Sequence, residues 1–174
     1  LYIHFFHTRR SSDLDASALE LLKTKARIVI TRTLSKAFGM ASLRIGYLMA
    51  CMPIIRKLAP LKMTYNISGI SEAIAIELLS RPEYVNMYVQ EIIALRAYAF
   101  NALTQIKSIQ VIPSEANFLL FQLCRPTDYE PLMAAYKAQH IVIRVLDSGK
   151  FIRVTLTSAS EFNRFLEVTK EVLQ

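Results

Sequence analysis

Apolar and polar residues near the amino end of the chain follow the patterns of strands and helices. Residues 1–6 alternate as a strand does, and residues 13–25 place leucines on one side of a helix that Asp13 can cap. Residues 26–30 form a mostly apolar run that predicts a buried strand. A strand, a helix and a strand in this order predict a right-handed βαβ unit with parallel strands. This part of the chain therefore has the pattern of an α/β fold.

The middle of the chain predicts one more strand and then mainly helices. Residues 46–50 read as a strand, a short helix begins at Pro53, and a loop covers residues 61–68. Further helices are expected from Ser71 to Ser80 and from Pro82 to about residue 106. The second of these carries large side chains near one face, which is typical of a buried stripe. They are Tyr84, Tyr88, Ile92, Leu95 and Tyr98.

After residue 109 the elements become short. Strands are predicted at residues 109–112 and 118–121, followed by a helix that Thr127 or Asp128 caps and that ends near Ala138. Two more strands and a last helix complete the pattern. The strands cover residues 140–145 and 151–155, a turn at residues 147–149 joins them, and the helix begins at Ser160. The pattern divides the chain into residues 1–80 and residues 81–174.

Composition suggests that this chain is a piece of a larger protein. It starts at Leu1 inside an expected strand and without an initiator methionine. Its hydrophobic content is 53% and its mean hydropathy is +0.29, which is high for a free-standing domain of this size. We therefore expect part of its apolar surface to be covered by a missing part of the protein.

Several classes of protein are disfavoured by the sequence. The longest apolar segment, residues 45–55, is broken by Pro53 and is shorter than the roughly 18 residues that span a membrane. No secretory signal is visible, and the net charge of +7 is spread along the chain rather than gathered into a nucleic-acid-binding stripe. The two cysteines lack metal-ligand spacing, and His4 and His7, which could be a metal pair, have no third ligand in view. We expect a cytoplasmic protein without nucleic acid, membrane or metal.

A lysine and an arginine follow the strand predicted at residues 26–30. Lys36 is either a surface lysine or an amine kept at the strand end as a nucleophile toward carbonyl groups. Arg44 is either on a solvated turn or an anion site, since its planar guanidinium suits a phosphate. Nearby hydroxyls that can complete such a site belong to Thr33, Ser35 and Ser42. An amine nucleophile next to a phosphate-sized anion site is the pairing that pyridoxal phosphate requires.

The segment around these residues also resembles a known family. Ser35-Lys36-Ala37-Phe38-Gly39 followed by Leu43-Arg44-Ile45-Gly46-Tyr47 is similar to the cofactor-lysine segment of the fold-type-I pyridoxal-phosphate aminotransferases, and most of all to histidinol-phosphate aminotransferases. The resemblance implies an α/β protein. Residues 1–80 would be the carboxyl-terminal part of the large, mainly parallel-sheet, cofactor-binding domain. Residues 81–174 would be a linking helix and a small α+β domain.

The resemblance assigns a cofactor role to several residues. Lys36 would hold pyridoxal 5′-phosphate as an aldimine and, once displaced, move the proton during the reaction. Tyr2 would hydrogen-bond the phenolic oxygen of the cofactor, although on its own it reads as a half-buried strand tyrosine. The aspartate that pairs with the pyridine nitrogen in the family falls just ahead of Leu1. The residues implied at the cofactor phosphate are Arg44, Ser35 and Thr33.

Three more residues are candidates for substrate binding. Arg153 interrupts an otherwise apolar or β-branched strand, and a buried guanidinium there needs either a structural ion pair or an anionic ligand. The resemblance implies that Arg153 binds the carboxylate or phosphate of the substrate and that Arg144 assists. Asn66 lies in a segment that is similar to one near the active site and the dimer contact in the family.

The implied reaction moves an amino group between a small-molecule donor and a 2-oxo acid. The donor would be histidinol phosphate, as in histidine biosynthesis, or an aromatic amino acid, the acceptor would be 2-oxoglutarate, and the enzyme would be a homodimer. Two alternatives stay open. One is a phosphothreonine-type decarboxylase of the same superfamily, which shares the lysine segment. The other is an inactive fragment, because the given sequence lacks the pyridine-nitrogen aspartate and the amino-terminal phosphate loop of the family. Its four glycines form no glycine-rich loop that could replace the missing one.

Overall fold

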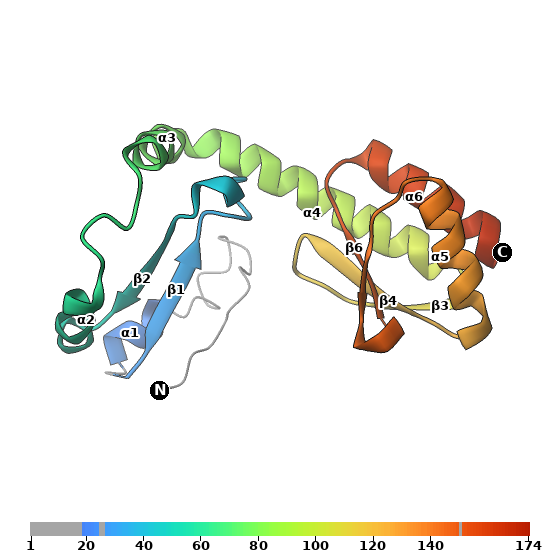
Figure 1. Ribbon diagram of the computed structural model, residues 1–174, viewed down its shortest axis with the longest axis horizontal. Coiled ribbons are helices and arrows are strands. Elements are labelled where there is room, and N and C mark those ends of the chain that lie inside the picture. The colour runs from blue at the N-terminus through green and yellow to red at the C-terminus, as the bar shows by residue number, and fades with distance from the viewer. Residues whose placement is uncertain (1–18, 25–26, 150) are drawn as a thin grey trace. The chain divides into compact units, whose positions relative to one another are not determined.

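The computed structural model describes residues 19–24, 27–149 and 151–174 (Figure 1). Its contacts divide the chain into two units, the first ending at Tyr88 and the second beginning at Val89. The strand predicted at residues 1–6, with Tyr2, and its parallel pairing lie outside the described residues. The division predicted after residue 80 stays a prediction. Within the described residues, no helix is long and apolar enough to cross a membrane.

The first unit contains one described pair of strands. Helix α1 covers Leu19–Thr24, β1 covers Val29–Thr33 and β2 covers Gly46–Ala50. The two strands are antiparallel, with Val29 opposite Ala50 and Thr33 opposite Gly46. The strand predicted at residues 26–30 thus starts later and continues to Thr33, while the strand predicted at residues 46–50 has the bounds of β2.

Two helices follow β2 in the first unit. Helix α2 covers Met52–Leu58 and has Pro53 in its first turn, where the missing N–H costs least. Helix α3 covers Gly69–Leu79. The Ser68 side chain accepts a hydrogen bond of 3.1 Å from the Ser71 N–H, so Ser68 is the N-cap and the helix starts before the predicted Ser71.

Helix α4, Pro82–Thr104, belongs partly to each unit (Figure 1). Its buried residues are Ile92, Leu95, Ala99 and Leu103, which repeat at helical spacing. The predicted stripe was wrong at its tyrosines, because the side chains of Tyr84, Tyr88 and Tyr98 are all exposed. Tyrosine tolerates such positions because its hydroxyl remains hydrated or finds a polar partner, as Tyr98 does by donating to Asn163 Oδ1 at 2.9 Å.

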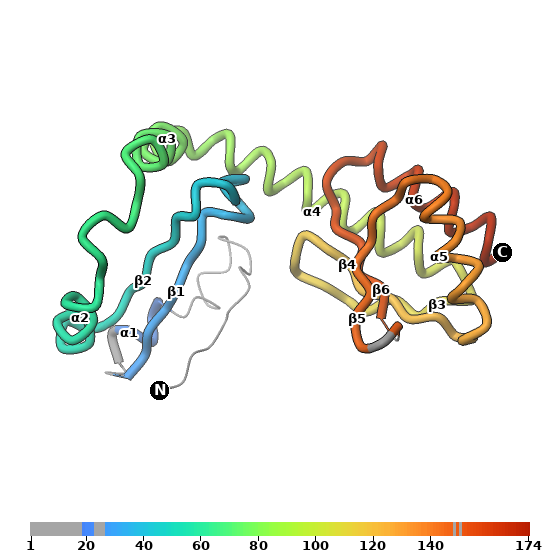
Figure 2. Tube along the Cα trace, in the orientation of Figure 1, coloured from blue at the N-terminus to red at the C-terminus, as the bar shows by residue number. Residues whose placement is uncertain are grey.

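The second unit is built on a four-stranded antiparallel sheet with the order β3-β4-β6-β5. Figure 2 shows β5 and β6 next to each other, and the register places Arg144 opposite Arg153. Each strand and helix predicted after residue 109 has a counterpart, but the strand predicted at residues 140–145 begins only at Arg144. The strands are β3 (Ile109–Ile112), β4 (Phe118–Leu123), β5 (Arg144–Leu146) and β6 (Phe151–Thr155), and the helices are α5 (Tyr129–Ala138) and α6 (Ala159–Leu173).

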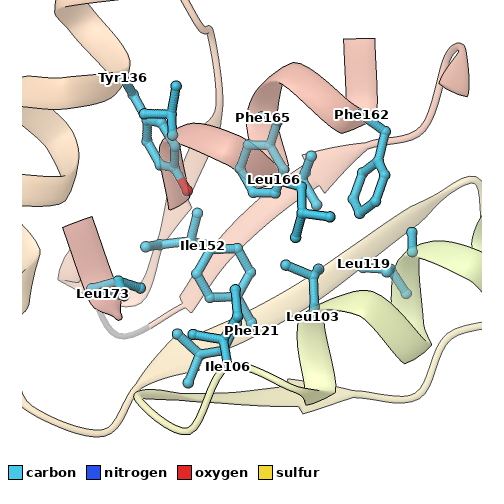
Figure 3. Close-up of a cluster of buried hydrophobic side chains, with 14 of the residues drawn as sticks. Leu103, Ile106, Leu119, Phe121, Tyr136, Ile152, Phe162, Phe165, Leu166 and Leu173 are labelled. Carbon is cyan, nitrogen blue, oxygen red and sulfur yellow. The ribbon is translucent and has the colours of Figure 1, made fainter. Parts of the chain in front are cut away.

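One face of this sheet meets the helices in a continuous core. Side chains from α4, α5, α6, β4 and β6 converge there, and the aromatic rings of Tyr136 and Phe165 stack at 5.3 Å (Figure 3). The core also holds a polar pair. Thr169 Oγ1 donates to the Phe165 carbonyl at 2.6 Å and lies 2.8 Å from the Tyr136 hydroxyl, which therefore donates to it. Burial raises the pKa of Tyr136 above its usual range.

Helix α6 begins with a hydrogen-bonded cap. The Ser158 hydroxyl accepts from the Glu161 N–H at 3.3 Å, so the helix begins at Ala159, one residue before the predicted start. The Glu161 carboxylate accepts hydrogen bonds from the hydroxyls of Thr157 and Ser158. Those bonds, with Thr157 the larger contributor, lower the pKa of Glu161 because they favour its charged form.

Candidate functional site

The connection between β1 and β2, residues 34–45, carries most of the candidate cofactor residues. Leu34 N donates to the Ile45 carbonyl at 3.1 Å, and Met40 N donates to the Leu34 carbonyl at 3.1 Å. The side chains of Leu34 and Met40 are buried in a small cluster with Ala75. The backbone bonds and the buried cluster hold the connection in a folded loop rather than an open one.

Lys36 lies at the turn within this loop. The Gly39 N–H donates to the Lys36 carbonyl at 3.0 Å, and Gly39 has φ of +67°, a left-handed conformation that glycine adopts at no steric cost. The side chain of Lys36 is exposed, and no acidic group of the described residues forms an ion pair with it. The desolvation expected of a nucleophilic amine is therefore not supplied by the residues that the structure describes, because the apolar side chains of the loop turn into its own cluster.

The hydroxyl residues before Lys36 shape the start of the loop. The Ser35 N–H donates to Thr33 Oγ1 at 3.1 Å, which turns the chain immediately after β1. Ser35 is half-buried and Thr33 is exposed. Thr33 thus orients the backbone of Ser35.

Arg44 ends a short 3₁₀ turn, Ala41–Leu43, in a left-handed backbone conformation with φ of 56° and ψ of 38°. Its side chain is exposed, and its Nη1 donates to the Ala41 carbonyl at 3.1 Å. This bond holds the guanidinium against its own turn and leaves other N–H groups for an anion. None of the acids in the described part of the chain forms an ion pair with it.

Gly46 keeps the two ends of the loop close together. A Cβ atom at this position would lie 2.8 Å from the Arg32 carbonyl oxygen, which is closer than side-chain carbons approach backbone. Glycine is therefore required for the antiparallel pairing of Thr33 with Gly46. The pairing in turn fixes the two ends of the loop that carries Lys36 and Arg44.

In the second unit, Arg153 and Arg144 lie directly opposite each other on β6 and β5. Arg144 is exposed. Arg153 is half-buried, its Cζ lies 5.1 Å from the centre of the Phe118 ring, and its Nε is buried without a hydrogen-bond partner. The structural ion pair that the sequence left open for Arg153 is absent from the described residues. Two arginines opposite each other on paired strands, without an acidic partner among the described residues, favour an anionic ligand.

Sequence reasoning missed the contact of Phe118 with Arg153. The signal was the alternation along β4, in which Leu119 and Phe121 are fully buried while Phe118 and Leu120 point to the other face of the sheet. The register places Leu120 opposite Arg153. The same face therefore carries Arg153 and its aromatic neighbour.

The candidate residues fall into separate groups. Four of them share the β1–β2 connection or the strand end before it, and two share the β5–β6 pair; these groups belong to different units. Asn66 is exposed in the loop before α3, and its side chain forms no hydrogen bond to either group within the described part of the chain. Tyr2 lies outside the described residues.

Comparison with known proteins places this chain in a family. The model of the aminotransferase class I and II family matches residues 1–168. The histidinol-phosphate aminotransferase of Methanocaldococcus jannaschii is 29% identical over 151 residues, which are 84% of this chain and 40% of that protein. Histidinol-phosphate aminotransferase 2 of Nitrosococcus oceani is 35% identical over 149 residues, 82% of this chain and 41% of that protein. The chain thus spans less than half the length of these curated relatives.

Solved structures show the same fold. The histidinol-phosphate aminotransferase from Clostridium acetobutylicum matches with a TM-score of 0.82 and 27% identity over 92% of this chain and 50% of that one. The histidinol-phosphate aminotransferase from Sinorhizobium meliloti, in complex with pyridoxal-5′-phosphate, matches with a TM-score of 0.72 and 21% identity. The match covers 86% of this chain and 42% of that one. L-threonine-O-3-phosphate decarboxylase from Porphyromonas gingivalis matches with a TM-score of 0.72 and 20% identity over 88% of this chain and 49% of that one. At this identity the likeness is one of fold alone. The chain belongs to the class I and II aminotransferases and has part of the fold-type-I pyridoxal-phosphate transferase fold.

Proposed function

We propose that this chain is part of a pyridoxal-phosphate-dependent aminotransferase that moves an amino group between histidinol phosphate and 2-oxoglutarate. The observation that carries the proposal is the β1–β2 connection, which holds an exposed amine and an exposed guanidinium in one hydrogen-bonded loop. Membership of the aminotransferase family supports the reaction class. The two curated relatives described above support histidinol phosphate as the donor.

The side chains of the connection fit the chemistry of pyridoxal phosphate. The cofactor presents an aldehyde, for which Lys36 offers a primary amine, and a phosphate, for which Arg44 and Ser35 offer N–H and O–H donors. No described acid competes for either cation. When bound, the cofactor supplies an electron-withdrawing ring that stabilises negative charge at the substrate α-carbon.

Each residue then has a defined task. Lys36 would hold the cofactor through Nζ, and the same amine would take the proton from the substrate α-carbon and deliver it to the cofactor carbon that carries the aldehyde. Arg44 and Ser35 hold the phosphate, and Thr33 orients Ser35 through the bond to its N–H. Tyr2 hydrogen-bonds the phenolic oxygen.

The second group of residues binds the substrate. Arg153, assisted by Arg144, binds its anionic group through charge-assisted hydrogen bonds, and the buried, unpartnered Nε of Arg153 supports this assignment. Asn66 contributes a polar contact to the substrate. The active protein is a cytoplasmic homodimer, which sedimentation of the purified full-length protein tests.

Reduction with borohydride tests the role of Lys36. The full-length protein, loaded with pyridoxal phosphate, should show a visible absorbance band, and reduction should attach the cofactor irreversibly to Lys36, as peptide mass spectrometry will show. Lys36→Ala should lose the band and lower transaminase activity by at least about 10²-fold, because the proton carrier is gone. Lys62→Ala, which changes another exposed lysine of the same unit, should retain both. A reduced adduct that persists in Lys36→Ala refutes the assignment.

Product analysis separates the aminotransferase from the decarboxylase. With histidinol phosphate as the donor, 2-oxoglutarate should be converted to glutamate. Release of carbon dioxide from L-threonine O-3-phosphate, without glutamate formation, would instead identify the decarboxylase reaction. Loss of cofactor binding together with both activities in the full-length protein would support an inactive relative.

A further inference from the structure

Arg96 makes a two-point contact with the loop between β3 and β4. Its Nη1 donates to the Ala116 carbonyl at 3.1 Å, and its Nη2 donates to Glu115 Oε2 at 2.9 Å. Only 13% of the Arg96 side chain is exposed, whereas 58% of the Glu115 side chain is. A planar guanidinium that binds a backbone carbonyl and a carboxylate at once fixes the position of both groups.

This contact differs from the other ion pairs of the described chain. Arg81 and Arg125 also pair with acids, but their side chains are 53% and 68% exposed and their partners are three or four residues away. Such exposed local pairs contribute little to stability or position. Arg96 reaches a loop that lies about twenty positions further along the chain, and it does so from a mostly buried site.

The loop that Arg96 holds, residues 113–117, determines where β4 begins. The Ala116 N–H donates to Ser114 Oγ at 3.0 Å, which tightens the loop. The Leu156 N–H donates to the Asn117 carbonyl at 2.9 Å, which continues the pairing of β4 with β6 by one residue beyond Phe118 and Thr155. A shift of the loop would therefore move the start of β4 and the end of β6 together.

The first residue of β4 is the aromatic neighbour of Arg153. Phe118 places its ring 5.1 Å from Arg153 Cζ, within the range of a cation–π contact. Because Arg153 Nε is buried without a hydrogen-bond partner, no described polar group orients this guanidinium through that atom. The Phe118 ring is then the contact that sets its plane, and the position of the ring depends on the loop that Arg96 holds.

We propose that Arg96 is a positioning residue, which holds the loop before β4 so that Phe118 orients the guanidinium of Arg153 toward the anionic group of the substrate. This inference rests on the substrate-binding role of Arg153 in the proposed function. It adds a residue on a different element, without contact to the substrate, that determines how strongly the substrate anion binds.

Titration with inorganic phosphate tests the inference. The probe is added to the full-length protein loaded with pyridoxal phosphate, and binding is measured by calorimetry. Arg96→Met keeps the length of the side chain but removes its donors, and we expect phosphate to bind about tenfold more weakly, which corresponds to about 1.4 kcal/mol. Arg125→Ala removes the exposed arginine after the other end of β4 and should bind phosphate as the unaltered protein does.

Combination with Arg153→Ala separates this inference from the proposed function. Arg153→Ala should weaken phosphate binding strongly, and adding Arg96→Met to it should cause no further loss, since Arg96 acts through Arg153. If Arg153→Ala weakens binding while Arg96→Met does not, or if the two losses add, the inference is refuted and the proposed function stands. If Arg153→Ala binds phosphate normally, the substrate role of Arg153 is itself refuted.

Two milder variants decide the matter if Arg96→Met does not fold. Glu115→Ala removes an exposed partner and leaves the bond of Arg96 to Ala116, so we expect a loss of about threefold. Arg96→Lys keeps the positive charge but not the paired N–H donors of the guanidinium. Its affinity for phosphate should lie between those of Arg96→Met and the unaltered protein. In both variants KM for histidinol phosphate should rise while kcat stays nearly constant, because a binding contact is misplaced and the proton transfer is not. Unchanged KM and phosphate binding in both would refute the inference.

Discussion

The unit that begins at Val89 and the unit that ends at Tyr88 bury their side chains to very different extents. The second unit, which begins at Val89, has a continuous core between one face of its sheet and three helices. Leu103, Phe121 and Tyr136 are almost fully buried in it. The described residues of the other unit bury a small cluster around Leu34, Met40 and Ala75. They leave many large apolar side chains exposed, especially on α2, α3 and the loop between them.

The two units therefore differ in how well their candidate residues are supported by buried side chains. The unit with the small cluster carries Lys36 and Arg44 on a loop that few apolar contacts support, whereas Arg153 lies on a sheet with a complete core. Regions with few buried contacts open at lower free-energy cost than packed cores do. Substitutions in the two units should therefore have effects of different size and extent.

The largest expected effect comes from the core of the second unit. Phe121 is fully buried among side chains of the sheet and helices, so Phe121→Ala should lower the free energy of unfolding by about 3–5 kcal/mol. Urea denaturation followed by far-ultraviolet circular dichroism measures this loss. Ile70→Ala, at a position on α3 that is 76% exposed, should change stability by less than about 0.5 kcal/mol. Similar losses in the two variants would contradict the comparison.

A smaller and more local effect is expected at Gly46. Gly46→Ala places a Cβ 2.8 Å from the Arg32 carbonyl oxygen, so the paired strands must separate, at a cost of about 1–3 kcal/mol. Hydrogen exchange of residues 34–45 should become faster, and pyridoxal phosphate should bind more weakly. Exchange in the core of the second unit should not change.

Gly69→Ala is the matched control for this variant. Gly69 lies in the first turn of α3 and has open space where a Cβ would be, so alanine there should be neutral or stabilise by up to about 1 kcal/mol. Equal acceleration of exchange in the two glycine variants would show that Gly46 does not hold the loop.

The smallest effect concerns the polar pair inside the second core. Burial raises the pKa of Tyr136, so the folded protein holds this proton after an unfolded tyrosine would have released it near pH 10. The stability linked to the proton is therefore fully present below about pH 10 and is lost as pH rises further. Tyr136→Phe should remove that alkaline loss and cost about 1 kcal/mol at neutral pH, because one hydrogen bond to Thr169 disappears. Urea denaturation at several pH values measures both.

The elements were largely predictable from the sequence because their signals are local. Short apolar stretches predicted β2 and the strands after residue 109, but the N-caps Ser68 and Ser158 were each missed, since neighbouring serines carry the same signal. The tyrosines of α4 were expected to be buried because helical spacing alone does not distinguish a core face from an amphipathic one.

The candidate site was predictable only where its residues are close in sequence. Lys36 and Arg44 were assigned to one loop because they follow one strand directly. The contact of Phe118 with Arg153, and that of Arg96 with Ala116, join residues from different elements, and strand order and register decide them. No local pattern encodes that register, so these contacts emerge only from the fold.

The left-handed backbone of Arg44 has a consequence for engineering this protein. A side chain with φ of 56° carries a steric penalty of roughly 1–2 kcal/mol that glycine avoids. Selection of random variants for heat resistance alone would thus enrich glycine at this position and discard the guanidinium. Screens for more stable versions of this protein should therefore also measure pyridoxal phosphate binding in every round, because the substitution that relieves the backbone at this position also removes the guanidinium.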